Sequence, residues 1–96
     1  MKRTYTGTTF HPDLRTAKVE LKLYRNNKYI DLEPMDRIQY TGVTAWDIIE
    51  GKEDAAEIEA QCGPEDMDVH HHYLVLHFED GSTATFRNTM VDMFIW

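Results

Sequence analysis

YLVLHFEDGSTATFRN, residues 73–88, decides most of the fold. Its two runs of β-branched and aromatic residues flank the dipeptide Asp-Gly at 80–81, a strong short-range signal for a tight hairpin turn. A two-residue turn there predicts that Val75 lies opposite Phe86. Apolar side chains fall on both faces of residues 73–78, as in a central strand that is covered on both sides. The stretch therefore predicts an antiparallel hairpin that is part of the core.

A second hairpin is predicted nearer the N-terminus. Residues 18–24, KVELKLY, alternate between apolar and charged side chains, which is the period of a half-buried strand. The Asn-Asn pair at 26–27 tolerates the backbone of a two-residue turn. A return strand over residues 28–33 would then place Leu23 opposite Ile30, so that apolar meets apolar across the pair.

Further strands are expected around these hairpins. Pro34 has no backbone donor and ends the return strand, after which residues 36–42, DRIQYTG, predict another short strand. The N-terminal segment TYTGTTF at 4–10 is rich in threonine and aromatic residues and also predicts a strand. The apolar C-terminal segment TMVDMFIW at 89–96 predicts a strand whose end is packed rather than frayed.

Two short helices are expected between the hairpins, over about residues 44–62. Thr44, followed three residues later by Asp47, resembles a capping box and predicts a helix over residues 45–50. Residues 52–62, KEDAAEIEAQC, are rich in helix formers and carry one narrow apolar stripe. The expected fold class is α+β: about six mostly antiparallel strands forming one sheet, with this helical insertion between two hairpins.

Size and composition limit the organisation of the chain. A chain of 96 residues supports one hydrophobic core and not two, so residues 1–96 are expected to form a single domain. Cys62 is the only cysteine, so no internal disulfide can form and the composition fits a reducing compartment. No segment approaches the roughly 20 apolar residues of a membrane span, so we expect a cytoplasmic protein without a membrane partner.

The net charge of −7 is unevenly distributed. Residues 1–37 hold eight Lys or Arg and five Asp or Glu, whereas residues 38–96 hold two and twelve. The acidic second part repels phosphate, which disfavours direct nucleic-acid binding and favours a protein partner with a basic surface. An alternative interpretation of any one of these acids is the solvated face of a helix. The predicted partner-binding residues are Asp47, Glu50, Glu53, Asp54, Glu57, Glu59, Glu65, Asp66 and Asp68.

A second hypothesis rests on the histidines. His70 and His72 alternate along an extended chain and can converge on one face, and imidazole is a common zinc ligand. Two ligands do not complete a metal site, and no zinc-binding spacing supplies the others. The alternative function is a small-molecule- or metal-binding protein, in one form at a homodimer interface, with a pocket lined by Trp46, His72, Tyr73 and His77.

The sequence offers no sign of catalysis. The only serine, Ser82, falls in a hairpin turn and the only cysteine at a helix end, so neither resembles an activated nucleophile. The five glycines are scattered rather than gathered in a phosphate-binding loop. We therefore expect a protein that is not an enzyme and needs no cofactor.

Residues 73–95, YLVLHFEDGSTATFRNTMVDMFI, resemble the terminal hairpin of small orphan proteins carried by phages and mobile elements of Gram-positive bacteria. Short acidic proteins of that kind include inhibitors of host defence, such as anti-CRISPR and anti-restriction proteins. Several of them present acid to a nucleic-acid-binding surface. The resemblance implies a phage-encoded inhibitor of host defence. From the acidic residues themselves, we expect such an inhibitor to block a basic nucleic-acid-binding site through residues 47–68.

Overall fold

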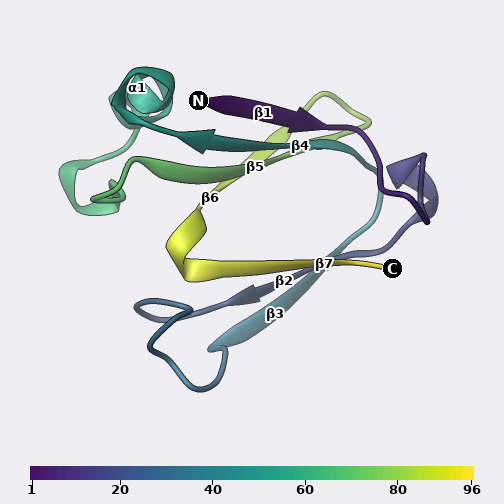
Figure 1. Cartoon of the computed structure of the whole chain (residues 1–96), viewed down its shortest axis with the longest axis horizontal. Helices are drawn as coiled ribbons and strands as arrows, with labels where there is room; N and C mark the ends of the chain where they lie inside the picture. The colour runs from purple at the N-terminus through teal and green to yellow at the C-terminus, as the bar shows by residue number, and fades with distance from the viewer.

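Seven strands in two antiparallel sheets and one α-helix make up the computed structural model, which describes residues 1–96. The first sheet has the order β1-β4-β5-β6 and contains β1 (Lys2–Tyr5), β4 (Val43–Glu50), β5 (His72–Phe78) and β6 (Thr83–Arg87). The second has the order β3-β2-β7 and contains β2 (Val19–Leu23), β3 (Asp36–Tyr40) and β7 (Val91–Ile95). Helix α1 (Lys52–Gln61) joins β4 to β5, and three 3-10 helices lie in other connections (Figure 1): η1 (Leu14–Thr16), η2 (Pro64–Asp66) and η3 (Asn88–Met90).

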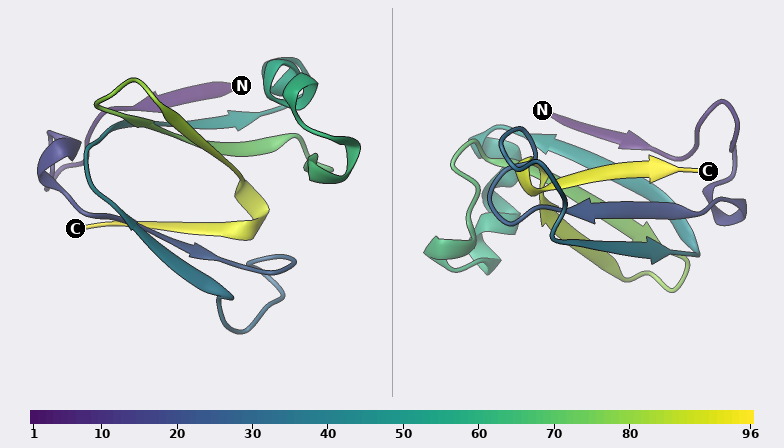
Figure 2. Two further views of the ribbon diagram at one scale, coloured as in Figure 1. Left: turned by 180° about the vertical axis from the view of Figure 1, so that it is seen from behind. Right: turned by 90° about the horizontal axis from the view of Figure 1, so that it is seen from below.

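The two sheets face each other and hold the main core between them (Figure 2). This core contains buried side chains from both sheets and from η1: Leu14, Val19, Leu21, Val43, Leu74, Leu76 and Val91. A smaller cluster lies on the other face of the four-stranded sheet, where α1 covers it: Ile49, Ala55, Tyr73 and Val75. Because neighbouring residues of β5 enter both clusters, β5 is the doubly covered central strand that its sequence predicted.

The α+β class is confirmed, but the prediction of a single sheet is wrong. The chain passes from one sheet to the other three times: through η1 between β1 and β2, at Gly42 between β3 and β4, and at η3 between β6 and β7. Gly42 has φ +73°, a conformation that glycine adopts without steric cost. Two facing sheets bury their apolar faces against each other, whereas one open sheet would leave most of such a face in water.

The predicted first hairpin is wrong. Strand β2 pairs with β3 and β7, so Leu23 lies opposite Asp36 and not opposite Ile30. Residues 24–35 form a loop, which we call the β2–β3 loop. Strands β3 and β7 pair with the two edges of β2 and bring apolar side chains to the core. Neither edge of β2 is therefore free to pair with a strand over residues 28–33.

The predicted helix over residues 45–50 is also wrong, because these residues belong to strand β4. The Thr44 hydroxyl does not cap a helix but donates to the backbone carbonyl of His77 at 3.3 Å. Trp46 and Ile48 pack against the main core, where aromatic and β-branched residues fit a strand well. Since β1 and β5 pair with β4 on both sides, tertiary pairing overrides the local capping signal.

The β5–β6 hairpin is confirmed, with a register that differs by one residue from the prediction. Val75 lies opposite Thr85 and not opposite Phe86. The amide of Phe78 donates to the carbonyl of Ser82, and the amide of Gly81 donates to the carbonyl of Phe78. The loop therefore has three residues, and Gly81 at φ +85° supplies the left-handed position that such loops require.

The remaining predicted elements are present. Helix α1 forms with Ala55 as its buried residue, and the strand predicted over residues 36–42 forms as β3. The C-terminal strand forms as β7, but the N-terminal strand covers Lys2–Tyr5 and not residues 4–10. At the C-terminus, the backbone amide and carbonyl of Trp96 bond reciprocally to those of Lys18 at 3.0 and 2.6 Å. None of the helices combines the length and apolarity required to cross a membrane.

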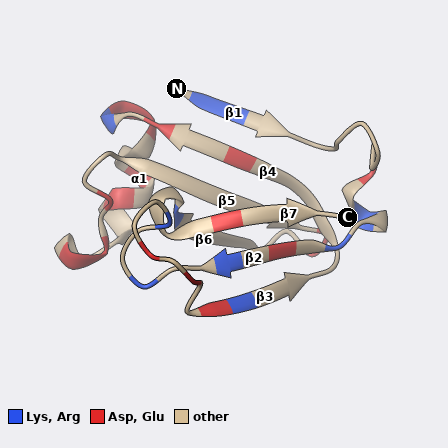
Figure 3. Ribbon diagram, turned by 60° about the horizontal axis from the view of Figure 1, so that its bottom comes forward, with Lys and Arg blue, Asp and Glu red and all other residues tan.

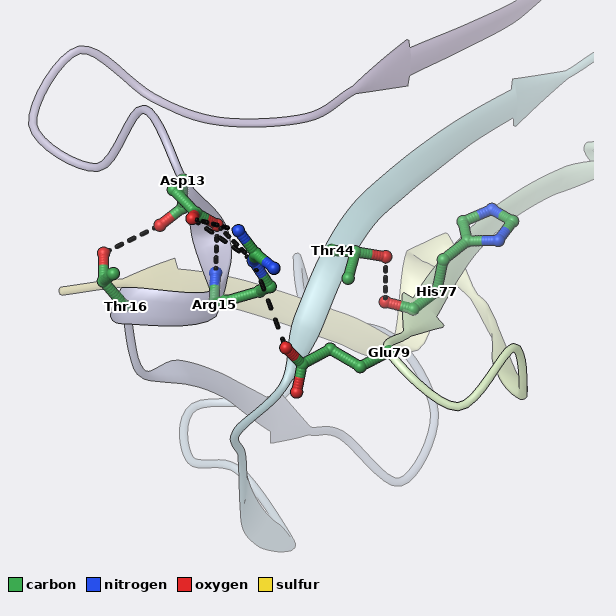
Figure 4. A network of polar contacts seen from close by, with 6 residues as sticks. All are labelled: Asp13, Arg15, Thr16, Thr44, His77 and Glu79. Carbon is green, nitrogen blue, oxygen red and sulfur yellow. Dashed lines mark hydrogen bonds and ion pairs between the residues drawn. The ribbon is translucent and has the colours of Figure 1, made fainter.

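One end of the sandwich is closed by the segment between β1 and β2. Leu14 of η1 is fully buried in the main core. Arg15 pairs with Asp13 at 2.8 Å, and its Nε atom lies 4.0 Å from the Glu79 carboxylate at the end of β5 (Figure 4). The opposite end of the molecule carries α1 and the β2–β3 loop (Figure 1).

Candidate functional site

The most distinctive surface lies at the end that carries α1 and the β2–β3 loop. A cleft of about 540 Å³ separates these two elements. Its lining is mainly apolar and comes from the loop side, from the C-terminal part of α1 and from the edge of the four-stranded sheet. Residues that represent these three contributions are Tyr24, Met35, Ile58, Cys62, Tyr73 and Phe86. The helix, the cleft and the loop together form one surface, which we call the end surface.

The β2–β3 loop is held in shape by its own polar side chains. Asp31 Oδ2 accepts from the backbone amide of Asn26 at 2.9 Å and from that of Asn27 at 3.4 Å. The bond from Asn26 lowers the pKa of the Asp31 carboxyl despite the opposing effect of desolvation. The Asn27 side chain accepts from the Tyr29 amide at 2.8 Å. The loop is also tied to the rest of the fold, because the amide of Lys28 donates to the carbonyl of Thr89 at 2.8 Å.

This fixed loop presents large apolar side chains to solvent. Tyr29 is 78% exposed, Ile30 is 76% exposed and Leu32 is 99% exposed. Met35, at the end of the loop that borders the cleft, is 58% exposed. Four large exposed apolar side chains thus fall within seven residues, and three of them, Ile30, Leu32 and Met35, line one shallow hollow. Clustered apolar side chains on a surface are more informative than single scattered ones.

The predicted acidic surface is present only in part. Asp47 and Asp68 are 3% and 4% exposed, so they lie inside the protein and cannot contact a partner directly. Three more acids have internal partners: Asp54 pairs with the N-terminal amine, and the contacts of Glu50 and Glu59 are described below. The acids that are exposed and form no ion pair are Glu53, Glu57, Glu65 and Asp66. They belong to α1 and η2, where Figure 3 shows acidic residues gathered.

Asp47 instead organises the outer face of the first sheet. Its carboxylate accepts from the Thr4 hydroxyl at 2.6 Å and from Nε2 of His77 at 2.6 Å, and the ammonium of Lys2 lies 3.9 Å away. Burial raises the pKa of the Asp47 carboxyl, but the bonds from Thr4 and His77 and the charges of His77 and Lys2 outweigh burial. The net effect is a lowered pKa, so Asp47 is a buried carboxylate that holds β1, β4 and β5 together.

Asp68 organises the loop that leads into β5. Its carboxylate accepts from the backbone amide of His70 at 2.7 Å and from the hydroxyl of Thr89 at 2.9 Å. Its own amide donates to the hydroxyl of Tyr73 at 3.0 Å. These bonds fix the turn in which His71 adopts φ +53°. Asp68 is therefore a structural residue that connects this loop to η3.

The histidines do not converge on a common site. Nε2 of His72 lies 3.1 Å from the Glu50 carboxylate, which also contacts Arg3 at 3.3 Å. His71 bonds to Glu59 at 2.5 Å, whereas His70 is exposed. No group of three or more His, Cys, Asp or Glu side chains is arranged so that it could hold a metal ion.

The predicted aromatic and histidine pocket is not assembled either. Of its four residues only Tyr73 lines the cleft. Trp46 stacks on Tyr5, with ring centroids 4.9 Å apart, and packs toward the main core. The His77 backbone accepts from Thr44, and its ring points away from that contact (Figure 4). Nε2 of this ring bonds to the Asp47 carboxylate. The structure thus places these side chains in separate packing and hydrogen-bonding arrangements.

The β2–β3 loop and its exposed apolar side chains were not predicted from the sequence. The return strand predicted over residues 28–33 after the Asn-Asn pair would turn Ile30 and Leu32 inward. A signal against a strand was present in Asn26, Asn27 and Asp31, because such side chains bond to nearby backbone amides and favour turns.

Comparison of the chain with known proteins found no matching family model, no matching curated protein and no matching solved structure. The function is therefore inferred from the end surface itself.

Proposed function

We propose that this protein is a non-enzymatic protein-binding module that holds its partner at the end surface. The observation that carries the proposal is the β2–β3 loop, in which polar side chains fix the backbone while Tyr29, Ile30 and Leu32 are left exposed. A loop whose shape is fixed before binding loses less conformational freedom when a partner docks on it. Exposed apolar side chains on such a loop are suited to contact another protein.

The apolar side chains supply most of the expected affinity. Complete burial of one large aliphatic side chain such as Leu32 stabilises a complex by about 1.5–3 kcal/mol. Tyrosine is among the residues that dominate interface energies, because it buries a large rigid ring and keeps a polar hydroxyl. Tyr29 and Leu32 are therefore the proposed anchors.

The acidic side chains define the kind of partner. Asp66 lines the cleft, Glu57 and Glu65 adjoin lining residues in the sequence, and Glu53 lies one helical turn before Glu57. None of them has an internal ion-pair partner, so their charges act on an approaching molecule. A basic protein surface would be attracted and oriented by this charge, which raises the association rate at low salt.

In its finer form the proposal is that of an inhibitor. A partner with a basic nucleic-acid-binding surface would present the positive charge that the acids of α1 and η2 complement. Occupation of that surface would block it, as expected for a phage-encoded inhibitor of a host defence protein. What supports this form is the negative charge of α1 and η2 together with the exposed apolar side chains of the β2–β3 loop at the same end of the molecule.

The test is capture of partners from a bacterial lysate by the tagged protein at low and high salt, identified by mass spectrometry. We compare the wild type with Leu32→Asp and with Phe10→Asp. Phe10 is 90% exposed and lies in the β1–η1 segment at the opposite end, so it is a matched control. One stoichiometric partner that is retained by Phe10→Asp and lost by Leu32→Asp supports the proposal. Equal capture by all three proteins refutes it.

A charge-reversal variant tests the acidic contribution separately. The double change Glu53→Lys and Glu57→Lys alters two exposed acids that have no internal partner. We expect weaker capture at low salt and little difference at high salt, because screening removes the charge effect. If the charge-reversed protein captures the partner as well as the wild type does at low salt, the partner does not dock through a basic surface.

A further inference from the structure

Strand β6 has an open edge beside the cleft. It pairs with β5 on one side and has no strand on the other (Figure 2). The amide of Phe78 donates to the carbonyl of Ser82, which makes these two residues a hydrogen-bonded pair. Hydrogen-bonded and non-hydrogen-bonded pairs alternate along an antiparallel ladder, so the amides and carbonyls of Thr83, Thr85 and Arg87 point away from β5.

The space next to this edge can accommodate the side chains of an added strand. Thr85, Phe86 and Arg87 line the cleft along the edge. On one face of the sheet the cleft is bounded by Ile58 and Cys62 of α1, and on the other by side chains of β2 and the β2–β3 loop. A neighbouring strand lies about 4.7–4.9 Å away and directs alternate side chains to opposite faces. Both sets of side chains would find apolar lining here.

The charges around the cleft distinguish between possible occupants. Asp66 and Arg87 both line the cleft, and neither forms an ion pair within the protein. Asp66 is the one acid that lines the cleft, α1 carries further exposed acids at Glu53 and Glu57, and the whole chain carries a net charge of −7. A second copy would bring like charges together, whereas a segment with basic side chains would meet opposite charge on the helix side.

We infer that β6 accepts an extended segment of another protein as an added β-strand, with apolar side chains in the cleft and a basic side chain near Asp66. Backbone hydrogen bonds to Thr83, Thr85 and Arg87 hold such a strand, and the cleft selects its side chains. This inference rests on the proposed protein-binding function and specifies the conformation of the bound segment.

The test uses random decapeptides displayed on phage and selected against the whole protein. Selected peptides are synthesised, their affinities are measured by fluorescence anisotropy, and protection of amides is followed by hydrogen exchange. Thr85→Pro removes an amide that points to the open edge, where proline is tolerated because no internal ladder bond is lost. Lys2→Pro is the matched control, because the hydrogen-bonded pairing of Met1 with Glu50 turns the Lys2 amide to the free edge of β1.

We expect selected peptides with alternating apolar residues and a basic residue, which slow exchange at Thr85 and Arg87. Thr85→Pro should weaken their binding about tenfold, and Lys2→Pro should not. Methylation of the peptide amides that face β6 should have the same effect as Thr85→Pro. Thermal unfolding of both proline variants checks that they are folded.

Four outcomes overturn the inference, the last of which leaves the proposed function standing. The first is that no peptide is enriched above the uncoated surface, and the second is that bound peptides protect residues elsewhere. The third is a concentration-dependent dimer that Thr85→Pro abolishes, since this would make a second copy the occupant. Binding that Leu32→Asp abolishes and Thr85→Pro leaves intact would exclude strand addition while the proposed function stands.

Discussion

Replacement of Asp47 by asparagine tests the assignment of this acid to the interior. In the folded protein its carboxylate accepts one bond from the Thr4 hydroxyl and one from His77 Nε2, and its side chain is 4% exposed. Asp47→Asn keeps the shape of the side chain and its bond to Thr4, but it replaces a charged acceptor with a neutral amide. If the amide nitrogen faces His77, the imidazole must change tautomer in order to accept.

The size of the effect follows from the loss of charge at one hydrogen bond. A bond to a charged group contributes about 1.5–3 kcal/mol, whereas a bond between neutral groups contributes about 0.5–1.5 kcal/mol. We therefore expect the free energy of unfolding at pH 7 to fall by about 1–2 kcal/mol. In a domain of this size each kcal/mol corresponds to a decrease in Tm of roughly 4–8 °C.

The pH dependence provides a second, independent readout. The pKa of Asp47 is lowered in the folded state, so its contribution is complete above the unfolded pKa and is lost as the pH falls through the folded pKa. The stability difference between the wild type and Asp47→Asn should therefore narrow below about pH 4, near the ordinary pKa of aspartate. The assay is urea unfolding followed by tryptophan fluorescence at a series of pH values between about 7 and 3.

Glu57→Gln is the control, because Glu57 is exposed, forms no ion pair and undergoes the same change of charge. This substitution should change the free energy of unfolding by no more than about 0.5 kcal/mol at every pH. If Asp47→Asn cost no more than Glu57→Gln at pH 7, or if the difference did not narrow on acidification, Asp47 would not be the buried carboxylate described above.

Three further substitutions or deletions test the packing. Leu21→Ala empties a fully buried position in the main core, and urea unfolding should show a loss of about 2–5 kcal/mol. Gly81→Ala meets no atom within 4 Å but must adopt φ +85°, so calorimetry should show a loss of about 1–2 kcal/mol from the backbone alone. Deletion of Trp96 removes two backbone bonds to Lys18, and hydrogen exchange should show a faster-exchanging Lys18 amide in a protein that stays folded.

Two of the correctly predicted elements depend mainly on neighbours in the sequence. Helix α1 follows from a run of helix formers, and the β5–β6 hairpin follows from an Asp-Gly turn between strand-forming residues. The burial of β5 on both faces was readable because its apolar residues are consecutive. The exact register of the hairpin could not be predicted, because the same Asp-Gly dipeptide fits a two-residue or a three-residue loop.

The predicted acidic residues also differ in whether nearby or distant parts of the sequence set their surroundings. The sequence identified the exposed acids Glu53 and Glu57, because their surroundings on a short helix are set by nearby residues. It could not separate them from Asp47, whose burial is caused by β1 at the far end of the chain. The residues next to an acid in the sequence do not show whether its carboxylate is a buried hydrogen-bond acceptor or an exposed charge.

By itself, the sequence determined the α+β class, helix α1, the central hairpin and the acidic character of one region. Only the tertiary structure decided that β2 pairs with β3 and β7, that residues 43–50 form a strand, and that residues 24–35 form an apolar loop beside a cleft. The physical reason is that several segments, distant from one another in the sequence, can pair with the same edge of a strand. Which of them pairs depends on the apolar surface that each segment buries, and that surface exists only once the two sheets face each other.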